Sequence, residues 1–399
     1  MSLNNTPSGE RLHISFFGKR NVGKSSLVNA ITNQEVSVVS DVLGTTTDPV
    51  KKSMEILPLG PVLIIDTPGF DDEGKLGEKR VEKAREILRK TDIAILVCDA
   101  SKETDDFDKS MIDLFLERDI PYIIAFNKCD TTEKREEVAN SIYVSAKTKE
   151  NVEELKEMIA KLKPDTSKNK CIVADLLNKG DTVILVTPID ESAPKGRIIL
   201  PQQETLRELL DYHMNVIVCQ LEELESSINM LNKKPSLVIT DSQVFEKVNE
   251  ILDKDIKLTS FSILFARYKG SLKTMVEGVS RIKSLKDNDN ILISEACTHH
   301  RQCNDIGSVK IPSWLEKYTG KKFNYSFTSG NEFPQKLDKY SLIIHCGGCM
   351  INEKEMKYRM KYVIMNNKAM TNYGILIAYI HNILNRSLEI FPDIAKMLS

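Results

Sequence analysis

The sequence predicts an α/β protein of three domains with mainly parallel sheets, and three observations support this class. The chain has 399 residues, which is more than one hydrophobic core needs. Short apolar runs alternate with amphipathic segments of helical period along most of its length, as in parallel sheets covered by helices. A glycine-rich loop also separates the first apolar run from the first helical segment, between residues 12 and 32.

The amino-acid composition excludes several functional classes for this protein. The hydrophobic fraction is 41%, the charged fraction 28% and the formal net charge -2, so no overall field favours nucleic acid or an anionic membrane. No apolar run reaches the length of a membrane span, and the first residues lack a basic-then-apolar secretory pattern. We therefore expect a cytoplasmic protein with neither a nucleic-acid nor a membrane partner.

The first glycine loop predicts a phosphate site. The segment "GKRNVGKSS" follows an apolar strand, opens a helix and satisfies G-x-x-x-x-G-K-[ST]. In such a loop backbone N–H groups surround the phosphates, Lys24 reaches the β- and γ-phosphates, and the Ser25 hydroxyl binds Mg²⁺. The predicted nucleotide contacts here are Gly18, Asn21, Val22, Gly23, Lys24, Ser25 and Ser26.

Three later strand ends complete a GTP site and predict a P-loop GTPase domain over residues 1–165. "VLIIDTPGF" places Asp66 on the Mg²⁺ side and the Gly69 amide toward the γ-phosphate. In "YIIAFNKCD" the Asp130 carboxylate can accept from both N1–H and the 2-amino group of guanine, which adenine lacks. The remaining predicted contacts are Asn127 and Lys128, followed by Ser145, Ala146 and Lys147 of "IYVSAKT".

Residues 12–162 resemble the translation-factor-class GTPases of the Era and TrmE type. The resemblance implies that Thr46 of "GTTTDPV" ligates Mg²⁺ and that Asn21 holds an activating K⁺. Phe70 stands where a Ras-like enzyme has its catalytic glutamine, and an apolar side chain cannot orient water, so hydrolysis should be slow. The residues expected to support catalysis are Lys24, Thr46 and Gly69, with no base nominated.

The polar, Pro-containing segment at 161–170 predicts a linker. After this segment the sequence again predicts alternating strands and helices. Residues 170–262 predict a domain with a core but no phosphate loop or catalytic cluster. By elimination we expect a dimerisation domain, and hence a homodimer. The third domain, 263–399, begins with a predicted helix at 266–285.

Two cysteine clusters in the third domain follow predicted parallel strands, where ligands bind in open α/β sheets. After the strand at 291–294 come Cys297, His299, His300, Cys303 and Asp305, and after a later strand comes "HCGGC", residues 345–349. Ordinary cysteines, a structural zinc site and an iron–sulfur cluster are all compatible with these residues. The Gly347–Gly348 turn should let backbone amides approach the sulfurs, but spacing alone does not decide between zinc and iron.

The pattern Cys-x-His, about fifty residues, then His-Cys-x-x-Cys behind an Era-like GTPase resembles the [FeFe]-hydrogenase maturation GTPases, the HydF family. The resemblance covers essentially the whole chain. It implies that Cys297, Cys346 and Cys349 hold a [4Fe–4S] cluster with one iron open or weakly ligated. Asp305, His299 and His345 are candidates for that fourth position, whereas ligation by Cys303 would close the site.

The same resemblance implies a scaffold and carrier. Such a protein receives a diiron precursor built by two radical-SAM maturases and delivers it to the apo-[FeFe]-hydrogenase, with GTP governing partner exchange. The alternative is a GTPase of RNA modification or ribosome assembly with a structural zinc site. This alternative hypothesis requires a basic surface with aromatic residues among the basic ones. The charge balance and the single tryptophan, Trp314, do not indicate such a surface.

Overall fold

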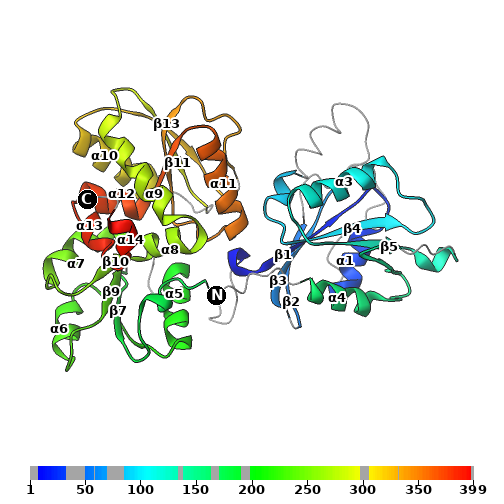
Figure 1. Cartoon of the computed structure of the whole chain (residues 1–399), viewed down its shortest axis with the longest axis horizontal. Coiled ribbons are helices and arrows are strands. Elements are labelled where there is room, and N and C mark those ends of the chain that lie inside the picture. Colours follow the sequence, from blue (N-terminus) through cyan, green and yellow to red (C-terminus); the bar gives the residue numbers. More distant parts are fainter. Residues whose placement is uncertain are drawn as a thin grey trace. The chain divides into compact units, whose positions relative to one another are not determined.

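The computed structural model describes residues 8–32, 50–57, 59–69, 85–133, 138–162, 170–189, 198–296, 305–330 and 332–396. It contains two compact units, residues 1–168 and 169–399 (Figure 1). The division between them falls in the polar segment that the sequence marks as a linker. Among the described residues no helix combines the length and apolarity needed to cross a bilayer.

A six-stranded sheet in the order β2-β3-β1-β4-β5-β6 forms the centre of the first unit. All neighbouring strands are parallel except β2, which pairs antiparallel with β3. The strands are β1 (Leu12–Phe17), β2 (Val50–Ile56), β3 (Gly60–Asp66), β4 (Ile93–Asp99), β5 (Tyr122–Asn127) and β6 (Ser141–Tyr143). Because the parallel strands end at one edge, the motifs that follow β1, β3, β5 and β6 meet there.

Helices cover both faces of this sheet, because successive side chains of a strand point to opposite faces. On β1, Phe16 packs in the cluster that includes side chains of α1 (Lys24–Thr32) and α4 (Val152–Lys161). Phe17 packs in a second cluster with α3 (Asp106–Glu117). Helices therefore cover both faces of this sheet, in agreement with the α/β class that the sequence predicts.

The second unit contains two four-stranded sheets, both entirely parallel, in the orders β10-β9-β7-β8 and β12-β11-β13-β14. The first comprises β7 (Thr182–Val186), β8 (Asn215–Cys219), β9 (Leu237–Thr240) and β10 (Leu258–Ser260). The second comprises β11 (Asn290–Ser294), β12 (Asn324–Thr328), β13 (Tyr340–His345) and β14 (Ala369–Asn372). The predicted α/β class with mainly parallel sheets is confirmed.

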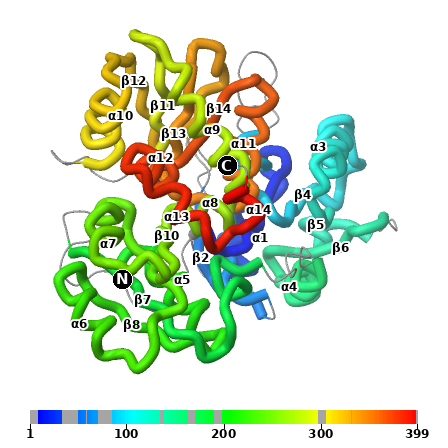
Figure 2. Tube along the Cα trace, turned by 60° about the vertical axis from the view of Figure 1, so that its left-hand side comes forward, coloured from blue at the N-terminus to red at the C-terminus, as the bar shows by residue number. Residues whose placement is uncertain are grey.

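One continuous hydrophobic core joins the two sheets of this unit. The helices are α5 (Leu200–Asp211), α6 (Leu224–Asn229), α7 (Phe245–Ile251), α8 (Phe261–Lys269), α9 (Leu272–Val279), α10 (Ile311–Thr319), α11 (Glu353–Met365), α12 (Tyr373–Ile380), α13 (Leu384–Ser387) and α14 (Pro392–Ala395). Figures 1 and 2 show α8, α12 and α13 between the two sheets. Helix α8 contacts α5 and β10 on one side and α11, α12 and β14 on the other.

The single helix predicted for 266–285 is wrong. The structure ends α8 at Lys269, begins α9 at Leu272 and adds a 3₁₀ turn, Ser280–Ser284. Gly270 leaves the helical conformation, and the Ser271 side chain accepts from Thr274 N to cap α9. The break redirects the chain directly after the buried Lys269.

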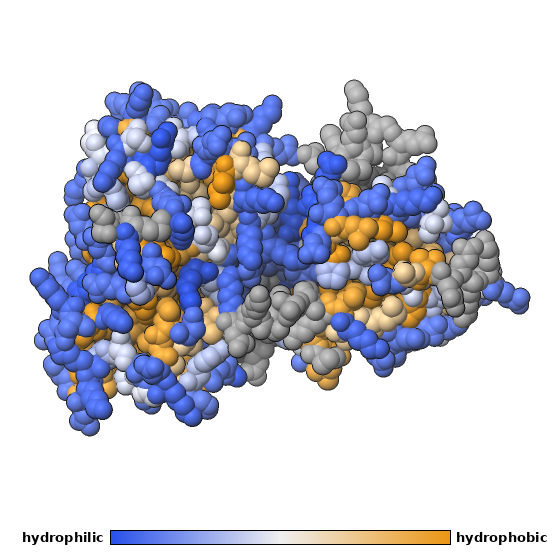
Figure 3. Space-filling view, viewed as in Figure 1, coloured by the Kyte–Doolittle hydropathy of each residue, from blue (hydrophilic) through white to orange (hydrophobic). Residues whose placement is uncertain are grey.

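On the face drawn in Figure 3, hydrophilic residues dominate the outer rim of each unit, and apolar residues show mainly inside that rim. Such a surface is expected of amphipathic helices whose apolar stripes face a sheet.

Candidate functional site

The glycine positions of the first loop are dictated by close packing. Gly23 has a φ of +87°, and a Cβ there would lie 2.3 Å from Asn127 Nδ2. Gly18 has a φ of +143°, and a Cβ there would lie 2.3 Å from the carbonyl oxygen of Val97. Only glycine fits both positions, since a side chain would be strained as well as obstructed. The loop therefore has the close-packed form expected for a phosphate-binding loop.

Lys24 and Ser25 extend from this loop toward the carboxyl end of β3. Lys24 Nζ donates to the carbonyl oxygens of Gly18 at 3.0 Å and Lys19 at 2.6 Å. Ser25 Oγ donates to Asp66 Oδ2 at 2.5 Å. Burial raises the pKa of the Asp66 carboxyl, while the Ser25 hydrogen bond and the Lys24 charge oppose that shift.

The other Asp66 oxygen, Oδ1, is buried and has no hydrogen-bond partner within the described part of the protein. A buried carboxylate oxygen beside a serine hydroxyl is a donor pair that a hard cation such as Mg²⁺ prefers. These two side chains therefore fit the predicted magnesium position.

Asn127 joins three of the predicted GTP motifs. Its Nδ2 donates to the carbonyl oxygens of Val22 at 2.9 Å and Gly23 at 3.4 Å, and its Oδ1 accepts from Ala146 N at 3.0 Å. Its side chain thus orders the loops after β1 and β6 rather than pointing into solvent.

Lys128 also links two loops. It has a φ of +66°, and its Nζ donates to the Asn21 carbonyl oxygen at 2.7 Å and to Asp99 Oδ2 at 2.7 Å. Asp99 lies at the end of β4. Although burial opposes it, hydrogen bonds from Lys128 and Ser101 hold the pKa of Asp99 below its usual value. Asp99 was not singled out from the sequence. Its only signal in the sequence is that it is a carboxylate at the end of an apolar strand.

The predicted guanine-reading carboxylate lies beside the loop after β6. Asp130 Oδ1 accepts from Ser145 Oγ at 2.7 Å, and Ser145 Oγ in turn accepts from Thr148 N at 3.1 Å. An open polar pocket of about 580 Å³ is lined by residues 129–133. Asp130 is therefore positioned by a neighbouring motif and lines this open pocket.

Not every predicted residue of the nucleotide site falls within the described ranges. Gly69 does, and a Cβ there would lie 2.9 Å from Arg20 Cα, so this loop packs directly against the first one. Ser26 and Lys147 are also described, half-buried and exposed respectively. Thr46 and Phe70 lie outside the described residues.

The second cysteine cluster begins at the carboxyl end of β13, next to the end of β11. Ser294 and His345 are register partners in the parallel pair, and Cys346 N donates to the Ser294 carbonyl oxygen at 3.0 Å. Two backbone amides then donate to Cys346 Sγ, Ala296 N at 3.0 Å and Gly348 N at 3.4 Å. The expected approach of a turn amide to a cysteine sulfur is confirmed.

Both thiols of this turn are half-buried. Burial raises the pKa of Cys346, and the two amide donors oppose the shift. Burial, followed by the negative charge of Cys346, raises the pKa of Cys349 to about 12, and the positive charge of Lys269 opposes it. The free thiols are therefore protonated near neutral pH, and a metal must displace those protons to bind.

His345 is fully buried, and both of its ring nitrogens are occupied. Nδ1 lies 2.8 Å from the Cys346 carbonyl oxygen and Nε2 lies 3.1 Å from Arg359 Nη1. Burial and then the Arg359 charge lower the pKa of His345 to about 3, so the imidazole is neutral, with Nδ1–H donating and Nε2 accepting. This arrangement favours a supporting role over the predicted candidacy as an iron ligand.

Arg359 itself sits in a buried network on α11 that sequence reasoning missed. Its Nε donates to Glu355 Oε1 at 2.9 Å, and its Nη2 donates to the Gly330 carbonyl oxygen at 2.9 Å. A lone arginine inside an amphipathic helix gives no sequence signal of such a role.

The first cysteine cluster is described only at its end. Asp305 caps the helical segment that follows it, and its Oδ2 accepts from Ser308 N at 2.7 Å and Ser308 Oγ at 2.8 Å. Cys297, His299, His300 and Cys303 lie outside the described residues. Within the described ranges no group of three His, Cys, Asp or Glu side chains forms a metal site.

The donor set near β13 nevertheless has the chemistry of an iron–sulfur site. Cys346 and Cys349 lie on one turn, and amide N–H groups already point at one sulfur, an arrangement that stabilises a thiolate carrying negative charge. These residues fit two of the three predicted thiolate ligands.

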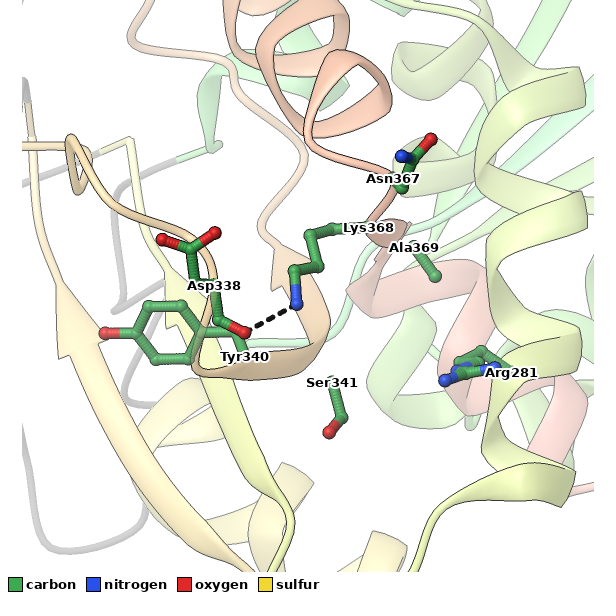
Figure 4. Close-up of a pocket in the computed structure, with 7 residues that line it drawn as sticks. All are labelled: Arg281, Asp338, Tyr340, Ser341, Asn367, Lys368 and Ala369. Carbon is green, nitrogen blue, oxygen red and sulfur yellow. Dashed lines mark hydrogen bonds between the residues drawn. The ribbon is translucent and has the colours of Figure 1, made fainter.

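A separate polar cavity of about 350 Å³ lies at the opposite end of this sheet (Figure 4). Its lining includes Tyr340 and Ser341, where β13 begins, whereas the cysteines follow the end of that strand. Lys368 Nζ donates there to the Asp338 carbonyl oxygen at 2.6 Å. The cavity is therefore distinct from the cysteine cluster.

Three family models match the chain. Residues 13–128 match the model described as a 50S ribosome-binding GTPase, which identifies a GTPase domain. Residues 172–270 match the hydrogen maturase F dimerization domain, and residues 273–390 match the hydrogen maturase F tetramerization domain. The last two adjoin one another and come from one family.

Several known bacterial GTPases are similar in sequence to the GTPase domain of this chain. The tRNA modification GTPase MnmE of Coxiella burnetii (strain RSA 493 / Nine Mile phase I) is 38% identical over 157 residues, which are 37% of this chain and 34% of that protein. GTPase Der of Wolinella succinogenes is 38% identical over 185 residues, 42% of this chain and 39% of that protein. The chain thus spans little more than a third of these relatives.

Among solved structures, Aquifex aeolicus Era bound to GDP and AlF4⁻ aligns with 55% of this chain and 98% of its own. The identity is 20% and the TM-score 0.35, so this likeness is too weak to carry an argument.

Proposed function

This chain belongs to the hydrogen maturase F family, and from that premise we propose that it is a GTP-hydrolysing scaffold and carrier for a metallocluster. In this proposal Cys297, Cys346 and Cys349 hold a [4Fe–4S] cluster. The protein receives a diiron precursor from two radical-SAM maturases and delivers it to apo-[FeFe]-hydrogenase.

The observation that supports cluster binding most directly is the pair of amide donors on Cys346 Sγ, at 3.0 and 3.4 Å. Hydrogen bonds to sulfur are one of the ways in which a protein stabilises and tunes an iron–sulfur cluster. When bound, the cluster supplies an iron whose fourth position exchanges ligands. The chain's own part is to orient the thiolates and to keep the turn at 346–349 rigid.

For the exchangeable position we favour Asp305 or His299 over His345. Both nitrogens of His345 are already engaged, and displacing either would leave Arg359 or a backbone carbonyl without its partner. Asp305 uses Oδ2 to cap a helix. Its second carboxylate oxygen gives it a way to ligate weakly without losing that cap.

In the GTPase domain, Lys24 would contact the β- and γ-phosphates, and Ser25 with Asp66 would hold Mg²⁺. Asp130 would accept the two guanine N–H donors while Ser145 positions its carboxylate. Thr46 would complete the Mg²⁺ shell, and Asn21 would hold K⁺. We propose slow intrinsic turnover that governs exchange of partners rather than the chemistry of the cluster.

A homodimer is proposed for this chain, because the two later domains match family models described by dimerization and tetramerization. A role in RNA modification or ribosome assembly is not favoured by any observation outside the GTPase domain. The relative named for tRNA modification, MnmE of Coxiella burnetii, matches 37% of this chain.

Activation of apo-hydrogenase by the purified, reconstituted protein tests the proposal. Cys346→Ala should abolish activation and leave GTP hydrolysis at the wild-type rate. Cys219→Ala, which alters another half-buried cysteine, serves as the matched control and should change neither. Full activation by the Cys346→Ala protein would refute the proposed scaffold role.

A further inference from the structure

A buried lysine contacts the turn that carries the two described cysteines. Lys269, the last residue of α8, is 1% exposed. Its Nζ donates to the carbonyl oxygens of Cys349 and Ile351, each at 3.1 Å. Lys269 thereby binds the backbone of Cys349, a proposed cluster ligand, and the backbone of Ile351. These contacts place a buried positive charge against the backbone of the turn that carries Cys349, rather than in solvent.

We propose that Lys269 compensates negative charge at the iron–sulfur site and thereby raises the reduction potential of the cluster. Its ammonium group is held beside the cluster by its hydrogen bonds to the turn at 346–351. This inference rests on the proposed function, since it requires a cluster bound by Cys346 and Cys349. A cubane core held by three thiolates carries net negative charge, and reduction adds another electron. A fixed cation buried beside it stabilises the reduced state more than the oxidised state.

Two features of the chain explain how Lys269 is placed. Gly270 ends α8, and a Cβ there would lie 2.8 Å from Met360 Sδ, so the chain turns away tightly just after the lysine. The ammonium group lies 5.8 Å from the centroid of the Phe265 ring, one helical turn earlier.

A purely structural role for Lys269 also exists, because a cation at the end of a helix stabilises the helix dipole. The test must therefore separate charge at the cluster from stability of the helix.

The experiment measures the reduction potential of the reconstituted cluster by EPR-monitored titration in the full-length protein. Lys269→Met removes the charge and the donor, whereas Lys269→Gln removes the charge and keeps an N–H donor. Both should shift the potential to more negative values, and Lys269→Arg should remain near the wild type. Lys273→Met, which neutralises an exposed lysine on α9, is the matched control and should leave the potential unchanged.

Iron affinity gives a second readout. Competition with a chelator should show an affinity about 10- to 100-fold lower for Lys269→Met, the range expected when a group that orients a metal ligand is lost. Thermal unfolding of the metal-free variants reports the structural contribution separately.

A wild-type potential in both Lys269→Met and Lys269→Gln would overturn the inference while leaving cluster binding intact. A wild-type potential in Lys269→Gln alone would also overturn it, because the hydrogen bond rather than the charge would then be responsible. If the wild-type protein takes up no cluster, the proposed function fails and this inference fails with it.

Discussion

Arg359 Nη1 lies 3.1 Å from His345 Nε2, in a fully buried contact between α11 and the end of β13. Burial and then the guanidinium charge lower the pKa of His345 and keep the imidazole neutral, and the Arg359 contact fixes its tautomer so that Nδ1–H is directed at the Cys346 carbonyl oxygen. One end of the cysteine turn is thus held through His345, and the other end is held by Lys269. The turn is ordered from both sides by groups that need not bind metal themselves.

The first prediction follows from this contact. His345→Ala should lower the free energy of unfolding of the metal-free protein by about 1.5–3 kcal/mol, the range for a hydrogen bond to a charged group. Because His345 is not expected to ligate iron, the reconstituted variant should retain the wild-type EPR signal. His381→Ala, at a partly exposed histidine of the same unit, is the control for both measurements. A changed EPR line shape in His345→Ala alone would make this histidine a ligand.

The second prediction concerns magnesium. Ser25→Ala should weaken Mg²⁺-dependent binding of a fluorescent GTP analogue by about 10- to 100-fold, since a hydroxyl beside the buried Asp66 carboxylate is lost. Ser110→Ala removes an exposed hydroxyl on α3 and should have no effect. Equal Mg²⁺ dependence in Ser25→Ala and the wild type would place the metal elsewhere.

Base selection gives the third prediction. Asp130→Asn exchanges one carboxylate oxygen for an N–H donor, which no longer matches the two guanine donors but does match the 2-oxo group of xanthine. GTP affinity should fall by about 10- to 100-fold, as expected for charge-assisted hydrogen bonds, and XTP affinity should rise. Competition binding with both nucleotides decides the point, and an unchanged GTP preference would exclude Asp130 from base recognition.

The fourth prediction concerns potassium. GTP hydrolysis should be faster in K⁺ than in Na⁺ at equal ionic strength, and Asn21→Ala should abolish that difference. Asn21 has a φ of +61°, so Asn21→Gly is the better-tolerated companion variant and should behave in the same way. Identical wild-type rates in the two salts would remove K⁺ from the account.

A fifth prediction uses the pH dependence of the Asp99–Lys128 pair, whose atoms lie 2.7 Å apart. The pKa of Asp99 is lower in the folded protein, so its contribution to stability is present above the unfolded value of about 3.9 and is lost as the pH falls below it. Asp99→Asn should cost about 0.2–1 kcal/mol at pH 7, the range for partly exposed pairs. Urea unfolding at pH 7 and near pH 3 should show the difference shrinking, and a constant difference would contradict this assignment.

Sequence patterns predicted which loops meet at one edge of the first sheet, because each motif of the proposed nucleotide site is contiguous and follows a strand. Asn127 ends β5 and Ala146 follows β6, and parallel strands bring such ends together without further information. Asp99 escaped prediction because its role depends on Lys128, which is twenty-nine positions away in the chain and meets it only through the β4–β5 pairing.

The cysteine site was harder to predict for a similar reason. The pattern "HCGGC" identified the thiols and the close amide, but it did not reveal that His345 would be buried against Arg359. Nor did it reveal Lys269, because the sequence around 266–285 reads as one continuous helix. The chain leaves the helical conformation at Gly270, where an added Cβ would lie 2.8 Å from Met360 Sδ, and the Ser271 side chain then caps α9.

Anaerobic reconstitution of the full-length protein with iron and sulfide tests the central claim most directly. The account predicts a brown protein with about four irons per chain, absorbance at about 400 nm and an EPR signal after reduction. That signal should be lost in Cys346→Ala and retained in Cys219→Ala. A colourless protein that retains zinc tightly through the same cysteines would contradict the account.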